Sequence, residues 1–159
     1  MTRFDDSTLT SETLAPLPGS SSGRGRVLII ACGALAREIL ALRDLNGWTH
    51  MDLTCLPAIL HNHPEKNAAA AQEAIDKHLG EYGQIFMAYA DCGTGGALQA
   101  VCDAAGVEMI AGPHCYSFFT GNAAFEAAGE VTSFFLTDFL ARQFDTFVVK
   151  PLGLDRHPE

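Results

Sequence analysis

The sequence predicts a three-layer α/β/α domain with a mostly parallel sheet of four or five strands, of the Rossmann or flavodoxin-like type. Short continuous apolar runs begin at residue 27 and are typical of strands buried on both faces of a sheet. They alternate with amphipathic segments of helical length. Such alternation implies right-handed βαβ crossovers, which put helices on both faces of a parallel sheet.

The elements follow one another at regular intervals from residue 26 onward. Apolar runs predict strands over residues 27–31, 51–55, 84–90 and 107–110, with a further strand over 131–136. Helices are expected over residues 34–45, 66–79, 97–105, 123–128 and 138–144. Gly80 and Gly106 stand where the second and third helices should end. The phenylalanines of the last apolar run, Phe134, Phe135 and Phe139, are expected in the core.

Residues 1–25 differ in composition from the rest of the chain. They are rich in Ser, Thr, Pro and Gly and carry almost no apolar pattern. Such a segment buries too little apolar surface to offset its ordering entropy. We therefore expect a flexible leader over residues 1–25 and a single α/β domain over residues 26–159. The total of 159 residues, 48% of them hydrophobic, fits one domain.

Charge and hydropathy exclude several classes of partner. The chain has 10 Lys and Arg against 19 Asp and Glu, and its formal charge of −9 argues against nucleic-acid binding. No apolar run approaches the roughly 20 residues that span a bilayer. The N-terminus lacks the basic start and apolar stretch of a secretory signal. A cytoplasmic location, with the five cysteines reduced, is the expectation.

Sulfur and imidazole side chains follow the predicted strands. Cys32 follows the first strand, Cys92 the third, and His114 and Cys115 the fourth. Since parallel strands end at one edge of a sheet, these groups should converge there. Cysteine and histidine are ligands for zinc or iron, so the four residues predict a metal site. An iron–sulfur cluster would need Cys55 as a fourth thiolate.

The alternative to a metal site is that each cysteine is simply a small hydrophobic residue of the core. For Cys102, in the middle of a predicted helix, core packing is the better interpretation.

The loop over residues 91–96 has two interpretations. Its glycines and the amides of the following helix could cradle an anion and lower the pKa of Cys92. It could equally be a tight turn capped by its own aspartate. The candidate substrate-binding residues are Asp91, Gly93, Thr94 and Gly95 from this loop, with Arg37, His61 and Tyr116 from elsewhere. Whether His63 and His157 join the site stays open.

Five segments, residues 31–38, 60–65, 88–96, 112–116 and 153–159, together carry a family resemblance. The chain from residue 26 onward resembles a bacterial and archaeal family known only as domain of unknown function 1638. The family's conserved cysteines and its His-Cys step fall on Cys32, Cys92, His114 and Cys115. Its members are often encoded beside corrinoid-dependent methyltransferases of methylamine and betaine metabolism. The resemblance therefore implies one-carbon metabolism but no settled activity.

These observations lead to three hypotheses for function. The first is a zinc or iron thiolate protein of one-carbon or methylamine-type metabolism, in which Cys32 and Cys92 help to activate a small thiol or amine. The second is a metal-independent enzyme that uses Cys32 and Cys92 as an acid–base pair, as aspartate/glutamate racemases do. The third is a non-catalytic accessory protein that binds a corrinoid partner or delivers metal to it. A corrinoid protein, a methyltransferase and a second copy of the chain are the macromolecular partners considered.

Overall fold

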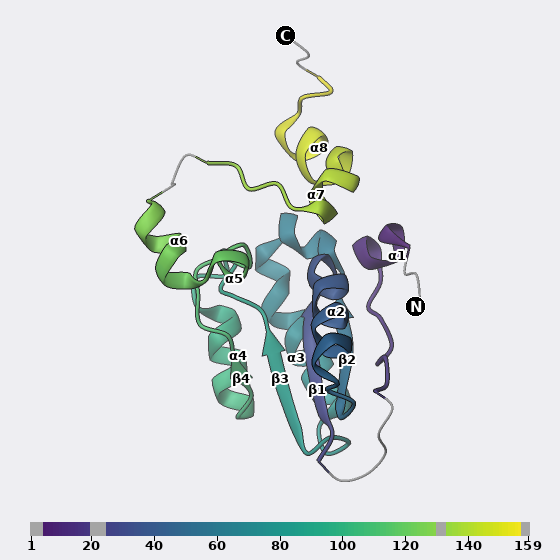
Figure 1. The fold of residues 1–159 in the computed structure, drawn as a ribbon. Helices are drawn as coiled ribbons and strands as arrows, with labels where there is room; N and C mark the ends of the chain where they lie inside the picture. The colour runs from purple at the N-terminus through teal and green to yellow at the C-terminus, as the bar shows by residue number, and fades with distance from the viewer. Residues whose placement is uncertain (1–4, 20–24, 130–132, 157–159) are drawn as a thin grey trace.

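A parallel sheet forms the centre of the computed structural model, which describes residues 5–19, 25–129 and 133–156. Its four strands lie in the order β2-β1-β3-β4 and all run the same way (Figure 1). The strands are β1 (Val27–Cys32), β2 (Met51–Leu56), β3 (Gln84–Ala88) and β4 (Glu108–Met109). The predicted parallel sheet is confirmed.

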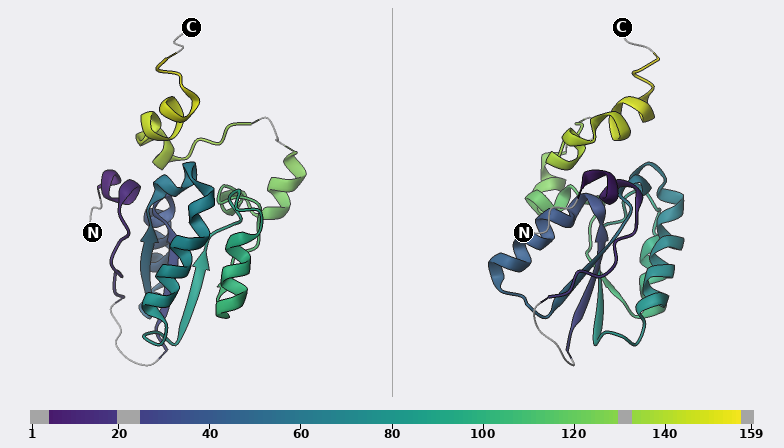
Figure 2. Two further views of the ribbon diagram at one scale, coloured as in Figure 1. Left: turned by 180° about the vertical axis from the view of Figure 1, so that it is seen from behind. Right: turned by 90° about the vertical axis from the view of Figure 1, so that its right-hand side faces the viewer.

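Helices cover both faces of this sheet. Helix α2 (Ala36–Asn46) lies on one face, and α3 (Asn67–His78) and α4 (Ala97–Ala105) lie on the other (Figure 2). Helix α4 ends at Gly106, whose φ of 65° is the left-handed conformation that glycine adopts at low cost. The three predicted layers are therefore present.

Strand order decides where a ligand would bind. The chain passes from β1 to β2 on one side and returns to β3 on the other side of β1. In open α/β sheets of this kind, the crevice lies at the carboxyl ends of the two strands where the order reverses. Here these are the carboxyl ends of β1 and β3.

Several short helices lie near the sheet, and others come after its last strand in the sequence. Near the sheet these are helix α1 (Asp6–Ser11) and the 3-10 helices η1 (Gly33–Leu35), η2 (Ala58–Asn62) and η3 (Pro64–Lys66). Beyond β4 come α5 (Ser117–Thr120), α6 (Asn122–Ala128), α7 (Asp138–Arg142), the π-helical turn η4 (Asp145–Val149) and α8 (Lys150–Leu152). Among the described residues, no helix has both the length and the apolar character needed to cross a bilayer.

The N-terminal segment is folded onto the domain over residues 5–19. Leu9 of α1 is fully buried, Leu14 is buried, and Leu17 forms an antiparallel bridge with Leu53 of β2. The carboxylate of Asp6 pairs with Arg37 at 2.6 Å and Arg142 at 2.7 Å. The prediction of a flexible leader is wrong for these residues because its few leucines, although widely spaced, each reach the core. Residues 1–4 and 20–24 lie outside the described part.

The predicted fifth strand is not formed over the part that the structure describes. Residues 133–136 are extended but pair with no strand there, and residues 131–132 lie outside the description. Phe134 and Leu136 are 61% and 53% exposed, so the expected burial of Phe134 is wrong. Phe135 packs its ring on Tyr116, with ring centroids 5.6 Å apart. Phe139 is a core residue, as predicted.

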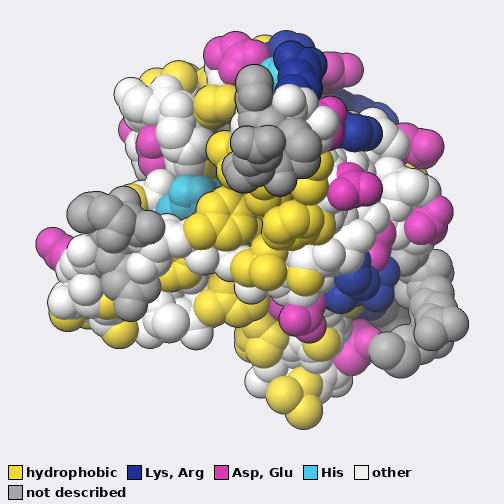
Figure 3. Space-filling view, turned by 90° about the horizontal axis from the view of Figure 1, so that it is seen from above, with side chains coloured by type: hydrophobic (Ala, Val, Ile, Leu, Met, Phe, Trp, Pro, Cys, Tyr) yellow, Lys and Arg dark blue, Asp and Glu magenta, His cyan; other side chains and the backbone are white. Residues whose placement is uncertain are grey.

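The C-terminal segment also carries exposed apolar side chains. Phe144, Leu152 and Leu154 are exposed, like Phe134 and Leu136 before them. Seen from above, hydrophobic side chains gather across the middle of this end of the molecule (Figure 3). This is the end at which the strands of the sheet finish.

At the opposite end of the sheet lies a buried charged cluster. Asp52, only 1% exposed, accepts hydrogen bonds from Gly19 N and the Tyr82 hydroxyl, both at 2.8 Å. It also forms an ion pair with Arg26, whose guanidinium lies 5.4 Å from the centre of the Tyr82 ring. We call Arg26, Asp52 and Tyr82 the amino-end cluster.

Candidate functional site

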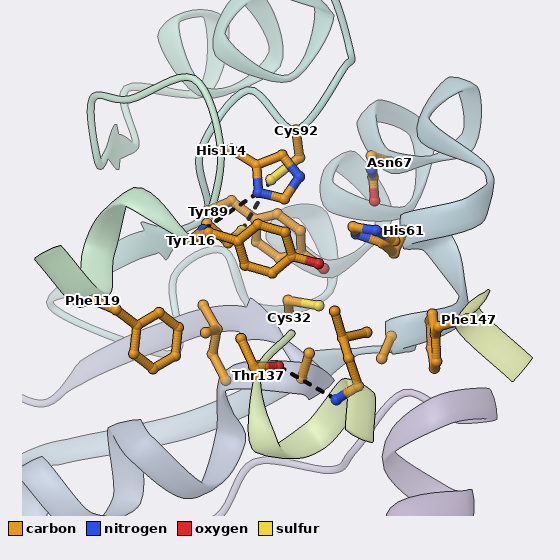
Figure 4. Close-up of a pocket in the computed structure, with 15 residues that line it drawn as sticks. Cys32, His61, Asn67, Tyr89, Cys92, His114, Tyr116, Phe119, Thr137 and Phe147 are labelled. Atoms are coloured by element: carbon orange, nitrogen blue, oxygen red, sulfur yellow. Dashed lines mark hydrogen bonds between the residues drawn. The ribbon is translucent and has the colours of Figure 1, made fainter. Parts of the chain in front are cut away.

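A pocket opens at the carboxyl ends of β1 and β3, where the strand order reverses (Figure 4). Elements far apart in sequence contribute to it. Its polar and sulfur-bearing lining residues are Cys32, His61, Asn67, Tyr89, Cys92, His114, Cys115, Tyr116 and Thr137. Its apolar lining includes Leu35, Phe119, Leu140 and Phe147. No Asp, Glu, Lys or Arg is among the described residues that line it.

Three thiols reach this pocket from three segments. Cys32 is the last residue of β1, Cys92 lies in the loop after β3, and Cys115 lies in the loop after β4. The sulfur atoms of Cys92 and Cys115 are 2.9 Å apart, although 23 residues separate them. The predicted convergence of Cys32, Cys92, His114 and Cys115 at one edge is therefore found.

The protein backbone holds the two cysteine loops together. Asp91 N–H donates to Gly112 O and Cys92 N–H donates to Pro113 O, each at 3.1 Å. Cys92 has a φ of 48°, a left-handed conformation that is uncommon outside glycine. The 2.9 Å contact between the sulfurs thus rests on a fixed backbone arrangement.

The three thiols differ in acidity. Burial raises the pKa of Cys32 to about 11. The hydrogen bond from the Cys115 thiol lowers the pKa of Cys92, and the same bond, together with burial, raises that of Cys115. Either sulfur can donate in this contact, and Cys92 is the thiol whose pKa the contact lowers. The predicted lowering of the Cys92 pKa is confirmed, although its main cause is Cys115 rather than a helix terminus.

Aromatic and imidazole rings line the pocket above Cys32. The ring centroids of His114 and Tyr116 are 4.1 Å apart, and those of His61 and His114 are 5.6 Å apart. Burial, with a smaller contribution from His61, lowers the pKa of His114 to about 4, so this imidazole is neutral at pH 7. Its Nδ1 accepts a hydrogen bond from Tyr116 N at 3.3 Å. The remaining ring nitrogen, Nε2, then carries the proton.

Most of the pocket residues lie in a region of the chain that matches a known family. The family model described as "Protein of unknown function (DUF1638)" matches residues 55–159. The chain belongs to the DUF1638 family. The matched region contains His61, Cys92, His114 and Cys115, whereas Cys32 precedes it. No curated protein and no solved structure matches the chain.

Among the residues of this DUF1638 pocket that were not foreseen from the sequence, two carry unpaired polar atoms. Tyr89 and Asn67 are buried, and the Tyr89 hydroxyl and the Asn67 Oδ1 have no well-formed hydrogen bond. The Tyr89 hydroxyl nevertheless lies close enough to Cys32 to lower the pKa of its thiol slightly. Buried polar atoms are seldom left unpaired, so these two atoms point to a bound group. Tyr89 directly follows β3 and Asn67 begins α3, and these two positions were the only features of the sequence that could have indicated a place in the pocket.

The glycine-rich loop does not form an anion cradle. The Asp91 carboxylate accepts hydrogen bonds from Gly96 N at 2.7 Å, Thr94 Oγ1 at 2.8 Å and Gly95 N at 3.2 Å. These bonds lower the pKa of Asp91 and occupy the amides that an anion would use. Asp91, Gly93, Thr94 and Gly95 do not line the pocket, so their predicted contact with substrate is not found.

Arg37 also lies away from the pocket of this DUF1638 protein. Its guanidinium pairs with Asp6 of α1, which the prediction treated as part of a flexible leader. His61 and Tyr116, the other two candidate substrate-binding residues, do line the pocket.

The remaining cysteine and histidine candidates are not part of the described pocket lining. Cys55 is buried within β2 and Cys102 is buried in α4, and neither lines the pocket. Core packing is thus confirmed for Cys102. His63 lies outside the lining and 3.5 Å from Glu65. His157 falls outside the described residues. Within the described ranges, no three His, Cys, Asp or Glu side chains already stand in the arrangement of a metal site.

Proposed function

We propose that this DUF1638 protein binds a soft metal ion, zinc in the first instance, through Cys32, Cys92 and Cys115, and uses it to activate a small thiol or amine. The observation that carries the proposal is the meeting of three thiols in one pocket whose described lining holds no carboxylate. Thiolate ligands without carboxylates favour zinc over magnesium or calcium. The proposed setting, one-carbon or methylamine-type metabolism, rests on the family resemblance alone.

Two of the three proposed donors, Cys92 and Cys115, could share a zinc ion after a modest side-chain adjustment. Two thiolates on one tetrahedral zinc lie about 3.8 Å apart, because each Zn–S bond is about 2.3 Å long. The Cys92 and Cys115 sulfurs are 2.9 Å apart, so they would separate by about 0.9 Å, which rotation about χ1 can supply. Cys32, with a pKa of about 11, needs a nearby cation in order to ionise at pH 7.

Cys115 is a better third ligand than His114. The Nδ1 of His114 accepts a hydrogen bond from its own chain, and this assigns the ring proton to Nε2. A metal-bound imidazole would need that proton on the other nitrogen. Iron remains the alternative ion. An iron–sulfur cluster is not proposed, because Cys55, its required fourth ligand, lies outside the pocket lining.

Three protein ligands leave one coordination position for a substrate, whose thiol or amine the bound metal would activate as a Lewis acid. The unpaired Tyr89 hydroxyl and Asn67 Oδ1 would orient that molecule. Tyr116, Phe119 and Phe147 would exclude water. Without Lys or Arg in the described lining, the pocket favours an uncharged or cationic substrate over an anion.

Metal analysis of matched variants tests the proposal. The full chain, purified without chelator, should contain about one zinc or iron per molecule. Cys32→Ser, Cys92→Ser and Cys115→Ser should each weaken metal binding by more than the roughly 10–100-fold that loss of an outer hydrogen-bond partner costs. Cys102→Ser, which changes a buried cysteine outside the pocket, is the control and should keep its metal. Equal metal content in the Cys92 and Cys102 variants would refute the assignment.

A metal-independent cysteine pair is the second candidate. The opposed pKa shifts of Cys32 and Cys92 favour it, since a protonated acid and an ionised base are what such a pair requires. Under this alternative the purified chain is metal-free, and iodoacetamide alkylates Cys92 at pH 7 much faster than Cys32 or Cys102. Stoichiometric metal that protects Cys92 from alkylation would exclude it.

A further inference from the structure

The contact between Cys92 and Cys115 has a second chemical outcome besides metal binding. A disulfide bond is about 2.0 Å long, and the two sulfurs are 2.9 Å apart. Closing them to bonding distance takes a movement of about 0.9 Å, as small as the opening that zinc would need. Two backbone hydrogen bonds already hold the two loops side by side, so the two sulfurs stay close to each other.

The two thiols are unequally placed. Cys92 is partly exposed, whereas Cys115 is buried behind it. A reagent entering from solvent therefore meets Cys92 first, and Cys115 stands in contact with the sulfur that has reacted.

We propose that Cys92 and Cys115 form a dithiol site that reduces small, uncharged disulfides and is itself converted to an internal disulfide. The Cys92 thiolate attacks one sulfur of R–S–S–R, forms a mixed disulfide and releases one RS⁻, which takes up the proton that Cys92 lost. The thiolate of Cys115 then attacks the Cys92 sulfur, forms the internal bond and releases the second RS⁻, which takes up the proton of Cys115. Two RSH molecules form, and the protein loses two electrons and two protons.

Charge decides which disulfides fit. The described lining of the pocket holds no Lys or Arg, and the chain carries a net charge of −9. The net negative charge would therefore repel anionic disulfides such as oxidised glutathione, and their carboxylates would find no cationic side chain in the described lining. An uncharged molecule such as 2-hydroxyethyl disulfide is not repelled and needs no cationic partner.

The other cysteines are poorly placed to compete. Cys102 is fully buried in α4, and Cys55 is buried within β2. Cys32 lines the same pocket but, unlike Cys92, its side chain is buried. If the metal site proposed above exists, the internal disulfide removes two of its three ligands, so oxidation and metal binding exclude each other. That consequence rests on the proposed function, whereas the disulfide itself does not.

Thiol trapping and fragment mapping test the proposal. The full chain, treated with chelator, is incubated with 2-hydroxyethyl disulfide, blocked with N-ethylmaleimide and cut after glutamate without reduction. Cleavage at Glu81, Glu108 and Glu126 separates residues 82–108, which hold Cys92, from residues 109–126, which hold Cys115. Since Cys102 shares the first fragment, the mapping is repeated in Cys102→Ser.

The expected result is a covalent link between these two fragments in the wild-type chain and in Cys102→Ser. Two of the five thiols are lost in the wild-type chain, and two of the remaining four in the variant. Cys115→Ser should stop at a stable mixed disulfide on Cys92, and Cys92→Ser should react at least tenfold more slowly. Circular dichroism confirms that each variant is folded, with Cys92→Ala and Cys115→Ala as replacements where it is not. Oxidised glutathione at the same concentration should react more slowly than the uncharged reagent.

A retained mixed disulfide on Cys92 in the wild-type chain, or a link from Cys32 to either loop, would overturn the proposal. Zinc separates the two ideas. If neither the wild-type chain nor any variant binds zinc but the fragments still become linked, the proposed metal function is wrong and the dithiol site is supported. If zinc binds at Cys92 and Cys115 but the chelated protein forms no link between the fragments, the dithiol proposal is wrong and the metal function is supported.

Discussion

The two ends of the sheet differ in how their buried polar groups are paired. In the amino-end cluster, the Asp52 carboxylate receives hydrogen bonds or ion pairs from Gly19, Arg26 and Tyr82, although the Arg26 Nε is buried without a hydrogen-bond partner. In the pocket at the carboxyl end, Tyr89 and Asn67 each carry a buried polar atom without a good partner. Bonds to a buried carboxylate stabilise the fold, whereas unpaired groups cost stability and are expected where a ligand completes them. The comparison sets a fully paired carboxylate against two neutral groups that lack partners.

The largest effect should come from Asp52→Asn. The substitution keeps the shape of the side chain but removes the charge that pairs with Arg26 and turns one acceptor into a donor. Breaking a largely buried pair in this way should lower the free energy of unfolding by about 3 kcal/mol. Urea denaturation followed by circular dichroism measures it.

Asp76→Asn is the matched control for Asp52→Asn. Asp76 is exposed on α3 and accepts a hydrogen bond from the Gln72 side chain, so its replacement should change stability by less than about 0.5 kcal/mol. Similar losses in both variants would mean that the amino-end cluster is not a stabilising unit.

Two tyrosines offer a direct comparison of the two ends. Tyr82→Phe removes a bond to a carboxylate and should cost about 1.5 kcal/mol. Tyr89→Phe removes a hydroxyl without a good partner and should be neutral or stabilising by up to about 1 kcal/mol. Thermal unfolding of the two variants beside the wild type measures both. A greater loss from Tyr89→Phe than from Tyr82→Phe would reverse the interpretation of the pocket.

A smaller loss than those of Asp52→Asn and Tyr82→Phe is expected from Asp91→Ala, which tests whether the glycine-rich loop is self-capped. Loss of its bonds in a partly exposed turn should cost about 1 kcal/mol at pH 7. The pKa of Asp91 lies below its ordinary value of 3.8, so its contribution is complete above that pH and is lost as the pH falls through the lowered pKa. Stability curves of wild type and variant should converge in acid. A constant difference would argue against a role for the carboxylate charge.

The fold and half of the site could be predicted because they follow from local patterns. Continuous apolar runs predict the strands of the sheet, and a parallel sheet brings Cys32, Cys92 and Cys115 to one edge. Contacts between segments that are distant in the sequence leave no comparable pattern in it. Thr137 and Phe147 line the pocket from beyond α6, and nothing near them in sequence indicates it.

The expectations that the structure contradicts rest on averages over a whole segment. Average composition predicts a flexible leader, yet single leucines such as Leu9 are fully buried. Strand propensity predicts a strand over residues 131–136, yet in the described part no strand lies beside residues 133–136 to pair with them. For the loop at residues 91–96, where the sequence leaves two interpretations open, the hydrogen bonds of Asp91 favour the self-capped turn.

The N-terminal segment has one more consequence, for self-association. In the order β2-β1-β3-β4, β2 is an outer strand, and such strands expose unpaired amides that can recruit another chain. Here Leu14 N donates to Cys55 O at 2.9 Å, and Leu17 N to Leu53 O at 2.7 Å. The other outer strand, β4, is only two residues long. Assembly by continuing the sheet from molecule to molecule, the route to fibrillar aggregates, is thereby blocked along β2 and nearly so along β4.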